Sequence, residues 1–173
     1  PSDSPDATAR SVLFGGLQHV GAELSAHETI TDEQETWGSI AQLAAEYETI
    51  AAAAQHDRWA GLVRTSGLTE SQAEAVIDSE AFGALAAELR RAEANHHDID
   101  RLLPRLVWAR GFEDADDVAS VIHHRLARAT ARPAGSGRNR TASRLIVGLI
   151  PHADGPMSRD MRDALDERHR LIE

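Results

Sequence analysis

The chain of 173 residues contains no cysteine and no lysine, so all eighteen of its basic side chains are arginine. The absence of cysteine excludes disulfide bonds, thiol nucleophiles and cysteine-ligated zinc. The absence of lysine excludes enzymes that form a Schiff base through a lysine, and it excludes P-loop nucleotide binding, whose motif needs that residue. Several common kinds of enzyme are therefore removed before any motif is considered.

Aromatic residues make up only 4% of the chain, although 42% of it is hydrophobic. The core must therefore be built from leucine, isoleucine, valine and many alanines, a mixture that favours helices over sheets. No apolar run approaches the roughly 20 residues that cross a bilayer, and the first residues lack the pattern of a signal peptide. We expect a cytoplasmic protein without membrane insertion, and the missing initial methionine suggests a fragment or a processed chain.

Apolar side chains recur at three- and four-residue spacing along most of the chain, which is the pattern of amphipathic helices. This pattern predicts helices over about 6–27, 32–64, 69–77, 79–92, 98–110, 113–129 and 158–172. We expect residues 144–151 to form a short buried helix, because a lone strand would have no partner. The fold prediction is an all-α bundle of six to eight helices, with one long central helix and an Arg-rich loop.

The same pattern predicts how the chain is organised. Residues 1–132 are expected to form the main helical bundle, 133–143 a flexible linker rich in Arg, Gly and Ser, and 144–173 a C-terminal helical segment that packs back on the bundle. Three tryptophans lie beside apolar helical stripes, which favours core or half-buried packing for them. They are Trp37, Trp59 and Trp108.

Acidic residues outnumber basic ones and give a formal net charge of −10, which argues against a dedicated binder of duplex DNA. Against this background, one stretch without any Asp or Glu carries six arginines. We predict that this stretch binds phosphate, an acidic protein surface or anionic lipid, because guanidinium groups make bidentate contacts with such anions. It also fits a helix C-terminus followed by a solvated linker. The six arginines are Arg125, Arg128, Arg132, Arg138, Arg140 and Arg144.

Nine histidines raise the alternative of a metal site. Glu93 and His96 match the Glu-x-x-His spacing of di-iron helical bundles, which need a second such pair on another helix. The nearest substitute is Asp166 with His169 in the terminal helix. These four residues define the alternative of a metal-dependent helical enzyme, whereas structural or solvated histidines are the interpretation that we favour, with no metal and no cofactor.

Several short segments resemble the C-terminal region of the large conjugative relaxase-helicases of actinobacteria, the MobF or TraA-like relaxases. The resemblance runs from about Thr31 to Glu173 and consists of the general character of these segments, without a catalytic motif. The segments are 58–63 (RWAGLV), 67–69 (GLT), 90–93 (RRAE), 100–104 (DRLLP), 116–119 (DDVA), 124–126 (HRL) and 148–151 (GLIP).

The resemblance implies a tail module without catalytic activity. In such proteins an upstream relaxase domain cuts plasmid DNA with a tyrosine beside a histidine-bound metal, and a P-loop helicase follows. Neither part fits this chain, whose single tyrosine, Tyr47, lies in a helical stripe. The implied role is to recruit the relaxase to the type IV secretion coupling machinery or to position it on plasmid DNA, with possible contact to the single-stranded DNA backbone. A third alternative is dimerisation through the heptad-like stripe of the long helix.

Overall fold

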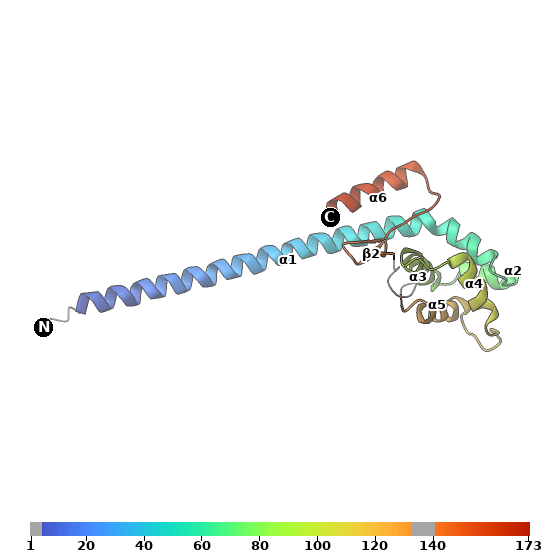
Figure 1. Cartoon of the computed structure of the whole chain (residues 1–173), viewed down its shortest axis with the longest axis horizontal. Coiled ribbons are helices and arrows are strands. Elements are labelled where there is room, and N and C mark those ends of the chain that lie inside the picture. Colours follow the sequence, from blue (N-terminus) through green and yellow to red (C-terminus); the bar gives the residue numbers. More distant parts are fainter. Residues whose placement is uncertain (1–4, 133–140) are drawn as a thin grey trace. The chain divides into compact units, whose positions relative to one another are not determined.

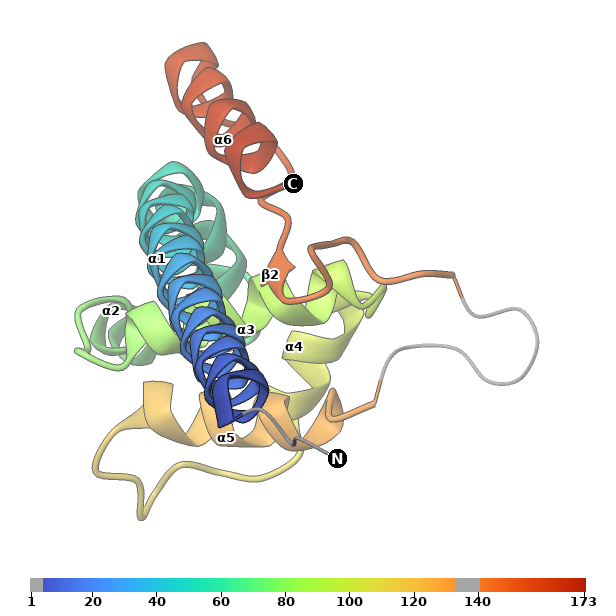
Figure 2. The ribbon, with the colours of Figure 1, turned by 90° about the vertical axis from the view of Figure 1, so that its left-hand side faces the viewer.

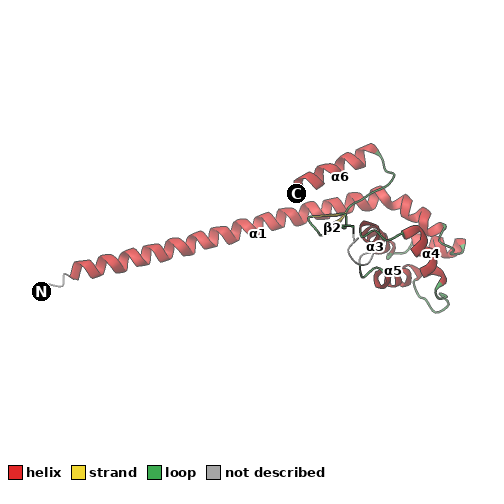
Figure 3. Ribbon diagram, in the orientation of Figure 1, coloured by secondary structure: helices red, strands yellow, loops and turns green. Residues whose placement is uncertain are grey.

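The computed structural model describes residues 5–132 and 141–173, with side chains from residue 29 onward (Figure 1). These ranges contain six helices and two short strands, as Figure 3 shows by colour. The prediction of an all-α multi-helix bundle is therefore confirmed. None of the described helices combines the length and the apolar character needed to span a bilayer. The helices are α1 (Pro5–Arg64), α2 (Glu70–Ile77), α3 (Phe82–Ala94), α4 (Ile99–Trp108), α5 (Val118–Ala129) and α6 (Arg159–Ile172).

Helix α1 is continuous, whereas the sequence predicted two helices with a break at 28–31. The four residues of the expected break include no proline or glycine, and threonine and isoleucine lower helix propensity only slightly. Hydroxyl groups in this region also bond within the helix, since Thr36 Oγ1 donates to the carbonyl of Asp32 at 2.8 Å. Thr31 and Gln34 have the spacing of a capping box in the sequence, and the structure shows that this spacing also occurs within a helix.

The chain divides into two units, Pro1–Gln42 and Leu43–Glu173, and the boundary between them lies within α1. The described part of the first unit is helix alone. In this unit Trp37 is 67% exposed, so the prediction that it is buried or half-buried was wrong.

The core of the second unit is built from the C-terminal part of α1 and from α2 to α5. Figure 2 shows the arrangement of α2 to α5 in a view along α1. Helix α3 is central to it, because α4, α5 and the second strand all pack against α3. Trp59 is buried in this core, as its sequence position predicted. The fully covered side chains include Trp59, Val63, Val76, Leu85, Leu89, Leu103, Ile122 and Leu126.

Local signals in the sequence predict several helix ends: Thr69 with Gln72 has the spacing of a capping box, Asp98 or Asp100 can begin a helix, and Ser158 can cap the last one. Thr69 and Gln72 form a complete capping box at the start of α2. Asp98 caps α4 by accepting from the backbone N–H of Arg101, and Ser158 caps α6 in the same way. These ends are set by bonds within four residues, which is why the sequence alone reveals them.

Residues 144–151 form a hairpin of two strands, β1 (Leu145–Ile146) and β2 (Ile150–Pro151), so the prediction of a short helix was wrong. The segment supplies its own partner strand by folding back, with Ile146 opposite Ile150. The turn places Val147 and Gly148 in left-handed backbone, with φ of 44° and 74°. A β-branched residue rarely adopts that conformation, so the turn has no signature in the sequence.

The hairpin and α6 are fixed to the rest of the second unit by polar contacts. The N–H of Ala153 donates to the hydroxyl of Tyr47 at 3.0 Å, and Arg168 pairs with Glu46 at 3.3 Å. The rings of His152 and His169 pack edge to face with their centroids 4.6 Å apart. Hairpin and terminal helix are thus joined to each other and to α1.

Trp108 at the end of α4 is 76% exposed, so the prediction of core or half-buried packing was wrong for it too. Its indole rests against Gly67 in the turn that follows α1, where φ is +100°. A Cβ at position 67 would overlap the indole nitrogen. Position 67 therefore requires glycine both for its backbone conformation and for this close approach.

Leu89 of α3 is buried in the core, so truncation of its side chain should destabilise the protein. Leu89→Ala removes a side chain that is 0% exposed and should lower the free energy of unfolding by about 2–5 kcal/mol, because a cavity remains. Leu171→Ala removes the same atoms from a site that is 59% exposed and should change stability by less than about 0.5 kcal/mol. Urea unfolding of both variants measures the difference; equal midpoints would show that α3 is not the core helix.

Burial lowers the pKa of His152, with a further contribution from neighbouring His169. The folded state therefore binds fewer protons at this position than the unfolded state, and stability falls as the pH drops through the ordinary histidine value of about 6.5. We expect the melting temperature to fall between pH 7.5 and pH 5.5, and to fall less in His152→Gln. Thermal melts followed by circular dichroism test this, and the same pH dependence in both proteins would refute it.

Candidate functional site

The four described arginines of the predicted binding stretch have two different roles. Arg144 precedes β1, and its guanidinium lies 2.7 Å from the carboxylate of Asp154. It also donates to the backbone carbonyl of Glu93. Arg144 therefore helps to hold the hairpin in place. Arg138 and Arg140 lie outside the described residues.

Arg125 on α5 ties the end of α4 to α5. Its guanidinium donates to the backbone carbonyls of Leu106 at 3.0 Å, Arg110 at 2.9 Å and Gly111 at 3.1 Å. It also lies 4.6 Å above the ring of Phe112. Carbonyls at a helix C-terminus lack partners within the helix, and a cation there also complements the helix dipole. Arg125 thus has a structural role that its charge alone did not reveal.

Arg128 and Arg132 are different, because both are exposed. Neither side chain makes an ion pair or a hydrogen bond with another residue in the ranges 29–132 and 141–173, and the same holds for Arg105 and Arg110 of the α4 region. All four lie on or near α4 and α5, while the chain as a whole is strongly acidic. This part of the second unit therefore carries cationic charge that internal carboxylates do not neutralise.

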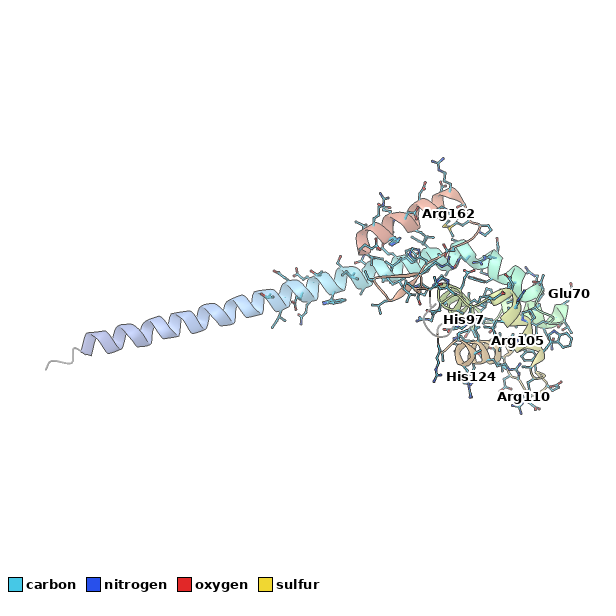
Figure 4. All side chains as sticks on the ribbon, viewed as in Figure 1. Glu70, His97, Arg105, Arg110, His124 and Arg162 are labelled. Atoms are coloured by element: carbon cyan, nitrogen blue, oxygen red, sulfur yellow. The ribbon has the colours of Figure 1, made fainter. Side chains whose placement is uncertain are left out.

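A groove of about 830 Å³ lies between α4 and α5. From α4 and the residues after it, the lining comprises Leu106, Ala109 and Arg110; from α5, it comprises Ser120, Val121, His124, Arg125, Arg128 and Ala129. Figure 4 labels Arg110 and His124 on the side of the molecule where these helices lie. The exposed surface of the groove is largely apolar, and each charged side chain that lines the groove is an arginine.

Helical spacing explains why these side chains share a groove. Positions 106, 109 and 110 fall on one face of α4 and its end, and positions 121, 124, 125 and 128 fall on one face of α5. Asp117 sets the start of α5 by accepting from the backbone N–H groups of Ala119 and Ser120. A hydrogen bond from the Ser120 side chain lowers the pKa of Asp117, so this cap is ionised at neutral pH.

The structure does not bring together the four residues of the metal alternative. Among the described residues, no group of three or more histidines and carboxylates is placed to hold an ion. Glu93 uses both carboxylate oxygens to accept from Arg58. Asp166 and His169 lie on α6, where His169 is 3.1 Å from Glu173.

The Glu-x-x-His spacing failed because His96 is not part of the helix. Helix α3 ends at Ala94, and His96 adopts left-handed backbone with φ of 64°. The N–H groups of His96 and His97 donate to the carbonyls of Glu93 and Ala92, which is the hydrogen-bond pattern of a Schellman helix end. The His96 ring then bonds the carbonyl of Ala142 at 2.7 Å, away from any common face with Glu93.

A second, more polar pocket of about 350 Å³ surrounds the pair of Arg58 and Glu93. Hydrogen bonding to Glu93 raises the pKa of Arg58, so the guanidinium stays charged in this partly buried position. Trp59 also lines the pocket, and its indole N–H has no hydrogen-bond partner among the residues described. The ion pair joins α1 to α3, which assigns it a structural role.

Three residues that line the α4–α5 groove were not among the site residues predicted from the sequence. Arg110 stands alone beyond α4 and is separated from the predicted stretch by an acidic run. Ala109 and Ala129 are small residues whose exposure creates the space of the groove. Arg110 lies fifteen residues before Arg125 in the chain. That separation does not predict that the two residues share a groove, because the packing of α4 on α5 brings them together.

The different roles of Arg125 and Arg128 can be separated by substitution. Arg125→Ala removes hydrogen bonds to three carbonyls and should lower the free energy of unfolding by about 1–3 kcal/mol. Arg128→Ala removes the same charge from an exposed site and should change it by less than about 0.5 kcal/mol. Denaturant unfolding of both variants tests this, and similar losses of stability would contradict the assignment.

The α4–α5 groove combines apolar surface with arginines that lack ion-pair partners in the described part of the chain, an arrangement suited to an anionic and partly apolar partner. Comparison of the chain with protein-family models, curated proteins and solved structures finds no match. The groove and its arginines are thus the features from which a function can be inferred.

Proposed function

We propose that this chain is a non-catalytic helical binding module that uses the α4–α5 groove to recruit a partner protein. Following the resemblance of its sequence, we place it at the C-terminus of a conjugative relaxase, where it recruits the relaxase to the type IV secretion coupling machinery. The observation that carries the binding role is the pair of exposed arginines, Arg110 and Arg128, on a largely apolar groove.

Three features support a protein partner over plasmid DNA. The net charge of −10 repels a long polyanion such as DNA. A short acidic segment of a protein interacts mainly with the arginines of the groove. No Phe, Tyr or Trp lines the groove, so the imidazole of His124 is the single ring there on which a base could stack. The apolar side chains of the groove make no favourable polar contact with a phosphate backbone, but such side chains are typical of the centre of a protein interface.

The other two functions have less support. Three of the four residues of the metal alternative are engaged separately: Glu93 in an ion pair, His96 at a helix end and His169 in a histidine–histidine contact. Dimerisation through α1 rests on the heptad-like stripe of the sequence and on the exposure of Trp37. Measurement of the mass in solution tests dimerisation independently of recruitment.

The recruitment proposal predicts that two arginine substitutions weaken partner binding. In Arg110→Ser/Arg128→Ser, affinity for the purified coupling protein of the same conjugative system should fall about three- to thirtyfold, since each exposed charge contributes modestly. Raising the salt concentration should weaken binding of the wild-type protein more than that of the variant. Fluorescence anisotropy with labelled coupling protein and with a labelled single-stranded 30-mer measures both candidate partners.

The matched control is Arg105→Ser/Arg159→Ser, which removes the same charge from two exposed sites outside the groove. Its affinity should equal that of the wild-type protein. Equal losses in both double variants would show that only net charge matters. Tight binding of the oligonucleotide, lost in the groove variant, would assign the site to DNA instead.

A further inference from the structure

We propose that the α4–α5 groove receives an amphipathic helix whose apolar face is flanked by Glu or Asp side chains. This inference rests on the proposed function and names the chemistry of the partner. It is motivated by the agreement between the shape of the groove and the sign of the charge along it.

The shape of the groove suits a helix. Its two walls are helix faces, and at the two small positions, Ala109 and Ala129, the walls present only methyl groups. Both alanines are exposed, so the space beside them is open to a partner. Leu106 and Val121 are half-buried and supply the apolar floor between the walls. A groove of this kind takes the apolar anchors that a helix presents at i, i+3, i+4 and i+7.

The charge of the groove selects acidic flanks. Arg110 follows one wall and Arg128 belongs to the other, and no carboxylate lines the groove. Since neither arginine has an ion-pair partner among the residues described, an incoming carboxylate does not have to displace an internal one. Glu113 and Asp114 line an adjoining hollow that shares Arg110 and Arg125 with the groove, and there they repel an acidic segment that would extend beyond the groove.

Arg125 gives the groove a fixed geometry before any partner binds. Its guanidinium is held by three backbone carbonyls, so this side chain forms part of the wall without needing to be ordered by the partner. Preorganised walls reduce the entropy cost of association. The two free arginines on either side then set the orientation of the helix through its acidic residues.

The test uses the full chain and three labelled synthetic probes. The first is an 18-residue helical peptide with leucines on one face and glutamates beside them; the second is a scrambled peptide of the same composition. The third is a single-stranded 18-mer oligonucleotide. Fluorescence anisotropy should show saturable binding of the first peptide and at least tenfold weaker binding of the scrambled peptide and the oligonucleotide.

Two protein variants locate the binding. Ala109→Asp/Ala129→Asp places carboxylates in the groove and should weaken binding of the ordered peptide at least tenfold. Ala52→Asp/Ala84→Asp adds the same charge at exposed positions outside the groove and should leave the affinity unchanged. Thermal melts establish that both variants are folded, and if the first is not, Arg110→Ser/Arg128→Ser replaces it with the same expected loss.

Several outcomes would overturn the inference. Equal affinity for the ordered and the scrambled peptide would mean that charge alone is recognised, and equal losses in both aspartate variants would place the peptide elsewhere. Preference for the oligonucleotide would make the groove a nucleic-acid site. If the ordered peptide fails to bind while the coupling protein binds and responds to Arg110→Ser/Arg128→Ser, the helix inference falls and the recruitment function stands.

Discussion

The burial of α3 is the constraint on which the second unit depends. Leu85 and Leu89 are completely covered, and α4, α5 and β2 all lie against this helix. Arg90 of α3 is only 2% exposed, and burial lowers its pKa, so its charge is costly to hold there. Glu48 of α1 provides the compensating ion pair. That pair ties α1 to α3, while α4 and α5, which pack on α3 and on each other, line the groove.

Much of this fold could be read from the sequence because its helices are set by local rules. The caps at Thr69, Asp98 and Ser158 involve bonds within four residues, and the apolar periodicity predicted the burial of Ile122 and Leu126 on α5 but wrongly that of Ala129, which is exposed. The one strand pairing of the described residues was missed. The hairpin at 145–151 exists because the segment pairs with itself through a left-handed turn at Val147, and no propensity scale predicts such a turn.

The candidate site was only partly predictable for the same reason. Charge segregation indicated Arg128, but it could not separate that residue from Arg125 and Arg144, whose guanidinium groups bond carbonyls and carboxylates of the chain itself. Arginine can do either, since its five N–H donors serve helix ends as well as anions. In a chain without lysine, the same residue type supplies both the internal ties and the free surface charge. Only the packing of α4 on α5 shows which is which.

The contact between Gly67 and Trp108 links two places that are otherwise separate. The indole rests on the backbone of the turn after α1, and the next two residues, Ala109 and Arg110, belong to the groove. A displacement of that turn would move the indole of Trp108. Ala109 and Arg110 follow Trp108 directly in the chain, so their positions in the groove would change as well. The geometry of the α4–α5 groove is therefore linked through Trp108 to the end of α1, and a side chain at position 67 would force the indole and that turn apart.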